Sequence, residues 1–274
     1  MSESDYISPG WSVFNTKLLR SKNEASNEPK EIKTDSFLYT RSIDSTGWLK
    51  VKSEPSGDMI YLCEYTKVLI QKKKGGRTYF LIKEGHFANQ NASLSDANVP
   101  KCLISYKRGT GATIKIKIKG RQRIKSTVRD EDKKPFDQLV AELSFLNKSI
   151  FITLDSDVMF EESDSTSPNY GQIIQSKPLK KGTYKIITPI IPKDKAYTDR
   201  YRTHRNGYPD LKYDVVWFPI EDAESRNSKF IHVGHLSEGC ITIYDFSKWN
   251  DLYQYLITNR MDSNGKYIGT VTIE

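Results

Sequence analysis

The stretch from Phe230 to Ile243 reads FIHVGHLSEGCITI, and it holds two of the four histidines and one of the three cysteines of this 274-residue chain. An apolar run enters the stretch, a β-prone run leaves it, and two glycines and a serine lie between them. This pattern predicts a strand, a tight loop and a second strand, with His232 ending the first strand and Cys240 beginning the second. We expect a hairpin, which would bring the imidazole and the thiol within contact distance.

The same stretch contains the parts of a nucleophilic site. A free thiol has a pKa of about 8.5, so it needs a neighbouring base or cation before it reacts at neutral pH. His232 can supply that help to Cys240. Gly239 lets the backbone turn sharply, so the amides of Glu238, Gly239 and Cys240 could converge on one point, as in an oxyanion hole.

The arrangement His232-x-Gly, a short loop and Ser237-x-Gly-Cys-Ile-Thr resembles the active-site signature of the L,D-transpeptidases, the YkuD-type catalytic domain. That family has a histidine at a strand end, a loop, and then Ser-His-Gly-Cys; here Glu238 replaces the second histidine. The segment 178–187 (PLKKGTYKII) is similar to the family's Pro-x-Gly-x-Tyr strand, so the resemblance covers about residues 145–274. The short loop is also similar to that of L,D-transpeptidase-like toxins that bacteria deliver into competitors.

The resemblance implies an enzyme that transfers acyl groups on peptidoglycan stem peptides, as a transpeptidase, a carboxypeptidase or a D-amino-acid exchange enzyme. Cys240 would be the nucleophile and His232 the base, with no cofactor and no metal. The backbone at Glu238 and Gly239 would hold the oxyanion. The residues assigned to substrate contact or to shaping the turn are Gly234, His235, Ser237 and Thr242.

Two details of the site follow from the residue types. Val233 follows His232, so we expect a backbone carbonyl to orient the imidazole. The charge of Glu238 would raise the thiol pKa if it faced the sulfur, so we expect this side chain to point to solvent or to the substrate amine.

Other interpretations of the stretch stay open. His235 is a rival base, three residues after His232. His232, His235 and Cys240 could instead be three ligands of a metal, although a structural zinc site needs four. The cysteine could also be a core thiol in a non-catalytic, basic, β-rich binding module.

Composition limits the cellular setting. No run approaches 18 apolar residues, so we expect no transmembrane helix. The first residues have no basic and apolar signal pattern. We therefore expect a protein made in the cytoplasm that acts in the periplasm or cell wall after specialised export, with an immunity protein as a possible partner.

The net charge of +8 raises the question of an anionic partner. Every charged residue in the range 101–129 is basic. Within it, Ile114 to Lys119 alternates apolar and basic residues, which favours one solvated face of a sheet over a nucleic-acid surface. We therefore expect no nucleic-acid partner.

The rest of the chain predicts a mainly β protein with few helices in three parts. These are a loosely ordered arm (1–34), a β-rich accessory domain built as a small barrel or sandwich (35–134), and an L,D-transpeptidase-like catalytic domain (135–274). We predict one helix over 135–148, from apolar residues at i, i+3, i+4 and i+7, and another that ends at Arg260 and buries Trp249, Leu252, Tyr253 and Leu256. The resemblance implies that segment 193–211 forms a lid or substrate wall, and an ordinary long surface loop is the other interpretation. Cys63 and Cys102 look like small buried hydrophobes, and a bridge between them stays open.

Overall fold

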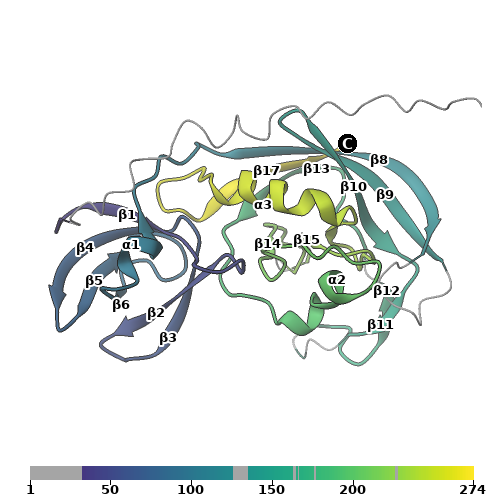
Figure 1. Ribbon diagram of the computed structural model, residues 1–274. Helices are drawn as coiled ribbons and strands as arrows, with labels where there is room; N and C mark the ends of the chain where they lie inside the picture. The colour runs from purple at the N-terminus through teal and green to yellow at the C-terminus, as the bar shows by residue number, and fades with distance from the viewer. Residues whose placement is uncertain (1–32, 126–134, 163–164, 166, 176, 226–227) are drawn as a thin grey trace, which may run out of the picture. The chain divides into compact units, whose positions relative to one another are not determined.

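The computed structural model describes residues 33–125, 135–162, 165, 167–175, 177–225 and 228–274 (Figure 1). The predicted arm at 1–34 lies outside this set except for its last two residues. Lys33–Glu274 forms one compact unit. Strands predominate and helices are few, which confirms the predicted mainly β fold. Within the described ranges, no helix has the length and apolar character needed to cross a bilayer.

The first part of this unit is a seven-stranded antiparallel sheet, drawn in purple to blue in Figure 1. Its strands alternate buried and exposed side chains, as in β5, where Thr78, Phe80 and Ile82 point inward. Their order across the sheet is β3 (Met59–Cys63), β2 (Trp48–Glu54), β6 (Asn91–Ser95), β5 (Arg77–Ile82), β4 (Lys67–Lys74), β1 (Phe37–Thr40) and β7 (Leu103–Ile104). The short helix α1 (Val99–Cys102) precedes β7.

The second part is an eight-stranded mixed sheet. Its order is β13 (Gly182–Ile187), β17 (Tyr267–Ile273), β8 (Ala112–Ile124), β9 (Phe136–Phe145), β10 (Lys148–Ser156), β16 (Ile241–Ile243), β15 (Phe230–Val233) and β14 (Phe218–Pro219). A separate pair is formed by β11 (Met159–Glu161) and β12 (Ile173–Gln175). The pairs β17–β8 and β15–β16 are parallel, and the other pairs of the large sheet are antiparallel.

Helix α3 (Trp249–Ile257) confirms the predicted helix after Cys240. It follows the 3-10 turn η2 (Phe246–Lys248) and buries Trp249, Leu252, Tyr253 and Leu256, the face expected from the sequence. These side chains join the apolar core of the eight-stranded sheet. Trp48 and Cys63 of the first sheet belong to the same cluster, so the two sheets pack together at these side chains.

The predicted helix over 135–148 is wrong, because residues 136–145 form the strand β9, paired on both sides. Bulges lie only in its neighbours, between Ile118 and Gly120 in β8 and between Thr153 and Asp155 in β10. Within β9 the buried side chains change face: Gln138 and Val140 are buried on one face, and Ala141, Leu143 and Phe145 on the other. The apolar residues therefore do not alternate along the whole strand, and their spacing imitates a helical stripe.

Strand β8 carries the basic run. Ile114 and Ile116 are buried while Lys115, Lys117 and Lys119 are exposed, which confirms that this run is a solvated face of a sheet.

Because β8 pairs with β9, the change from one sheet to the other lies between Ile104 and Ala112. The boundary predicted after residue 134 falls instead in the connection between β8 and β9. Residues 126–134 of that connection lie outside the described residues.

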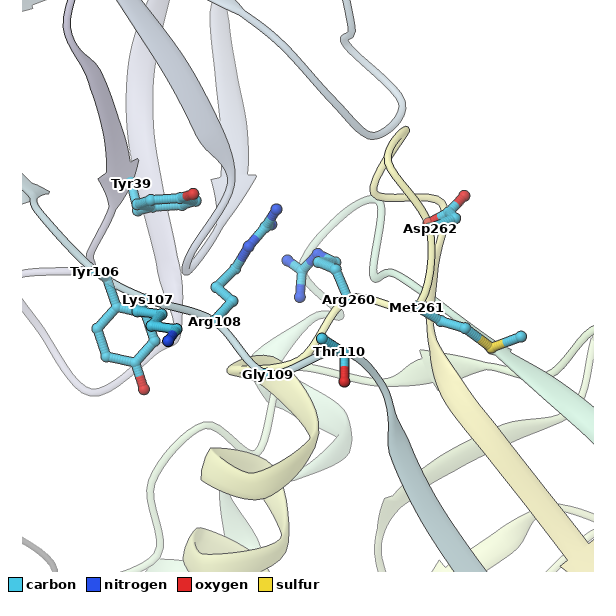
Figure 2. A pocket seen from close by; sticks show the side chains of 9 residues that line it. All are labelled: Tyr39, Tyr106, Lys107, Arg108, Gly109, Thr110, Arg260, Met261 and Asp262. Atoms are coloured by element: carbon cyan, nitrogen blue, oxygen red, sulfur yellow. The ribbon is translucent and has the colours of Figure 1, made fainter.

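Buried charges tie the first sheet to α3 and to the residues that follow it. Arg260 donates to the carbonyl oxygens of Ile257 (2.8 Å) and Glu64 (3.3 Å). The Glu84 carboxylate, only 2% exposed, accepts two hydrogen bonds from Arg108. Figure 2 shows Arg108 and Arg260 beside a polar pocket of about 390 Å³. Both guanidinium groups are bound by protein acceptors, so we assign the two arginines a structural role in holding the first sheet to the residues after α3.

We predict that Glu84→Gln lowers the free energy of unfolding by about 3 kcal/mol, because it leaves a buried guanidinium without its counter-charge. Chemical denaturation followed by fluorescence measures this loss. The matched control is Glu224→Gln, which breaks the exposed pair with Lys180 and should change little. Equal losses in the two variants would contradict the buried-charge account.

Candidate active site

The predicted hairpin between His232 and Cys240 is wrong in one respect: the two strands are present, but they run parallel. β16 pairs antiparallel with β10 on its other side, and β15 pairs antiparallel with β14, so the surrounding sheet sets both directions. Parallel neighbours usually need a connection of about a dozen residues or more. The strands here are so short that the seven residues 234–240 are enough to return the chain.

This register decides which side chains share the site. Ile231 lies beside Ile241, and His232 lies beside Thr242. Continuing the register by one residue places Cys240 beside Phe230. Because side chains two residues apart in a strand share a face, the thiol and the imidazole become diagonal neighbours on one face of the sheet.

The imidazole of His232 is held on two sides. Its ring stacks on Trp217, with centroids 4.1 Å apart and planes inclined by 19°. Its Nδ1 atom lies 2.9 Å from the carbonyl oxygen of Val233. A carbonyl can only accept, so Nδ1 carries the proton and Nε2 presents a lone pair. This contact confirms the expectation that a backbone carbonyl orients the ring.

The environment keeps that ring neutral. Burial lowers the pKa of His232, the contact with the Val233 carbonyl partly opposes this, and the ammonium of Lys193 adds a smaller lowering effect, so that the pKa is about 4. A histidine with this pKa is uncharged near pH 7. Its unprotonated nitrogen, Nε2, lies 3.5 Å from the hydroxyl of Thr242.

The thiol of Cys240 is also neutral at rest. The residue is half-buried, and desolvation raises the pKa of its thiol. A backbone hydrogen bond at Phe230 and the charges of Lys229 and Lys193 act in the opposite direction. Glu238 is exposed, as expected, yet its carboxylate still raises this pKa slightly. The resting pair is therefore a thiol and a neutral imidazole.

Two buried polar side chains clamp the loop before Cys240. Gln138 of β9 donates to the carbonyl oxygen of His235 (2.9 Å) and accepts from the amide of Ser237 (3.3 Å). Ser156 of β10 donates to the carbonyl oxygen of Ser237 (2.7 Å). The hydroxyl of Ser237 then donates to the carbonyl oxygen of Cys240 (2.8 Å), in line with its predicted role in the turn. Rigid strands thus fix the position of the cysteine.

Glycine is required at two points of this loop. Gly239 has a φ of +88°, a conformation that other residues rarely adopt. Among the described residues, no backbone carbonyl outside the strand ladders accepts a hydrogen bond from the amides of Gly239 and Cys240. A Cβ on Gly234 would lie 2.9 Å from Thr242 Cγ2 and 3.6 Å from His232 Cε1, so only glycine leaves room for these side chains.

His235 takes a different place from the one a rival base would need. Its ring is buried and lies edge-on to Tyr201 at 5.3 Å, with Phe246 at 6.3 Å. Within the described residues, no three His, Cys, Asp or Glu side chains gather as metal ligands. The strand register thus brings Cys240, Thr242 and His232 to one face. The alternative His-His-Cys ligand set is not assembled among the described residues.

The segment 193–211, which we call the wall segment, begins at Lys193, whose ammonium lies over the rings of Trp217 and Phe230. It contains the 3-10 turn η1 (Lys195–Tyr197) and the short helix α2 (Arg200–Thr203). Buried Asp214 accepts hydrogen bonds from Thr198 (2.5 Å) and Arg202 (2.7 Å) and so anchors the wall.

Four residues that shape the site carry little or no signal in the sequence. Gln138 and Ser156 hold the loop, while Lys193 and Trp217 flank the imidazole. Gln138 was assigned to the predicted helix, and its only signal is a polar residue within an apolar run. Lys193 and Trp217 approach the site through long-range packing and carry no local signal.

Comparison with protein-family models, with curated proteins and with solved structures finds no match for this chain.

We predict that alkylation of Cys240 by iodoacetamide is slow near pH 7 and accelerates as the pH rises above about 8.5. The thiolate is the reactive form, and a raised pKa moves its appearance to higher pH. Peptide mapping by mass spectrometry measures the rate at each pH, with glutathione as the free-thiol reference. Buried Cys102, whose thiol pKa is also raised by burial, is the internal control and should react more slowly still. Fast labelling that is independent of pH from about pH 6 upward would reveal a preformed ion pair and contradict this account.

Proposed function

We propose that the chain is a cysteine-dependent acyltransferase that acts on peptidoglycan stem peptides, in the manner of the L,D-transpeptidases. The observation that carries the proposal is the shared face of Cys240 and His232, with the Val233 carbonyl leaving Nε2 as the basic nitrogen. The resemblance of the motif supplies the substrate class. The turn at Gly239 adds two amides that can bind a developing oxyanion.

The first half-reaction follows from these positions. The sulfur of Cys240 attacks the carbonyl carbon of the peptide bond before the terminal D-residue, while Nε2 of His232 accepts the thiol proton. The oxyanion forms near the amides of Gly239 and Cys240. When the C–N bond breaks, the imidazolium returns the proton to the departing amine, and a thioester remains on Cys240.

The second half-reaction reverses these roles. An amine, water or a free D-amino acid attacks the thioester carbonyl and gives its proton to Nε2. The C–S bond then breaks, and the imidazolium protonates the sulfur. The products are a cross-linked peptide, a shortened peptide or an exchanged peptide, respectively, so the identity of the acceptor separates the three activities.

The electrostatics constrain how the proton moves. The thiol pKa lies above its ordinary value and that of His232 lies near 4. Forming a separated thiolate and imidazolium would therefore cost about 1.4 kcal/mol for each unit by which the thiol pKa exceeds the imidazole pKa. Proton transfer must accompany the attack of sulfur, because the ion pair is too unfavourable to form beforehand.

The competing candidate is a non-catalytic, basic, β-rich binding module. The raised pKa of the Cys240 thiol and the contact of His232 Nε2 with Thr242 favour it. In that case the thiol is a half-buried packing group. The two candidates differ in whether Cys240 is needed for chemical change of a substrate.

We propose an antibacterial effector as the biological setting, acting on the wall after specialised export and restrained by an immunity protein. The support is the similarity of the short loop to L,D-transpeptidase-like toxins.

Incubation with purified muropeptides tests the proposed function, with products identified by mass. We predict D-alanine release, dimer formation or D-amino-acid exchange with the native protein, and none of these with Cys240→Ala. His232→Ala should lower the rate by at least about 100-fold, because the general base is lost. His235→Ala should only weaken activity.

Cys102→Ala is the matched control, since it removes a buried thiol outside the site, and it should keep the native activity. Activity that survives in Cys240→Ala would contradict the thiol mechanism. No product from the native protein would favour the binding module.

A further inference from the structure

Lys193, at the start of the wall segment, is a cation close to the reactive pair. Its Nζ atom lies 4.5 Å from the ring centroid of Phe230 and 5.3 Å from that of Trp217. Trp217 stacks on His232, and Phe230 lies beside Cys240 in the continued strand register. The ammonium is thus held by two aromatic rings that border the imidazole and the thiol.

The backbone around these groups is fixed. The amide of Lys193 donates to the carbonyl oxygen of Val215 (2.9 Å), and the indole nitrogen of Trp217 donates to that of Asp214 (3.2 Å). Lys193 therefore enters the site from an anchored segment.

Lys193 also has capacity to bind an anion. Among the described residues, no carboxylate oxygen lies within ion-pair distance of its Nζ atom. The adjacent Asp194 uses Oδ1 to accept from the amide of Ala196 (2.9 Å). The charge of Lys193 nevertheless lowers the pKa of both His232 and Cys240, so its field reaches both groups. A positive charge beside the site with no protein counter-ion is suited to an anionic ligand group.

A groove of about 550 Å³ adjoins Lys193. It lies between the first sheet, which contributes Trp48, Lys50 and Tyr61, and the wall segment, which contributes Lys193 and Asp194.

We propose that Lys193 binds the terminal carboxylate of the acyl donor, so that the site selects peptides whose leaving residue has a free carboxylate. This inference rests on the proposed function, which defines the acyl donor and its leaving D-residue. The carboxylate of that residue is attached to the carbon next to the scissile nitrogen. An ammonium beside Cys240 and His232 is therefore placed to bind it while sulfur attacks the neighbouring carbonyl.

Calorimetric binding in the Cys240→Ala protein, which cannot turn over, tests the proposal. The probes are a synthetic stem tetrapeptide ending in D-alanine and the same peptide as its C-terminal amide. We expect the free acid to bind about tenfold more tightly, as for a charge-assisted hydrogen bond. Adding Lys193→Gln should remove this preference, and Lys193→Arg should retain most of it. Lys212→Gln is the matched control, because it removes an exposed charge away from the site, and it should retain the preference in full.

An unchanged preference in Lys193→Gln, no preference in the parent protein, or no binding of either peptide would overturn the proposal. A second measurement needs no change at Lys193. The indole ¹⁵N–¹H signal of Trp217 in the Cys240→Ala protein should shift with the free acid and much less with the amide. Equal shifts with both peptides would also overturn it.

The outcomes also separate this inference from the proposed function. Selective binding of the acid without any D-alanine release by the native protein would reject the enzyme and keep the carboxylate site. Release of D-alanine without acid preference would keep the enzyme and reject the role of Lys193.

Discussion

The parallel pairing of β15 and β16 is the constraint on which the site depends. Two strands of three and four residues lie side by side only because β10 and β14 hold their outer edges. That pairing sets Thr242 beside His232. Cys240, two residues before Thr242, then lies on the same face of the sheet. A slip of one residue would turn the thiol to the opposite face and separate it from the imidazole.

The supports of this pairing come from distant parts of the chain. Gln138 and Ser156, which pair across β9 and β10, hold the loop that delivers Cys240. Asp214 anchors the wall that carries Lys193 and precedes Trp217. The reactive pair itself is compact in sequence, but its geometry is maintained by strands and loops that begin about a hundred residues earlier.

This contrast between a pair that is close in sequence and supports that are distant in sequence explains which features the sequence could predict. Alternating apolar residues and turn residues predict most strands, and the apolar spacing from Trp249 to Leu256 predicts α3, because both patterns are local. The strand β9 has a helix-like apolar spacing because its buried side chains change face between Val140 and Ala141. The direction of β16 could not be predicted, since a three-residue run does not identify its neighbours. Trp217 and Lys193 reach the site through tertiary packing and were missed for that reason.

The most direct test of the central claim is ¹⁵N NMR of the His232 imidazole. The account predicts a neutral ring near pH 7 with the proton on Nδ1 and none on Nε2, and titration with a pKa of about 4. Because this pKa is lowered, the ring should become charged only when the pH falls to that range. A charged ring near pH 7, or a proton on Nε2, would contradict the claim that His232 presents a basic nitrogen to the face it shares with Cys240.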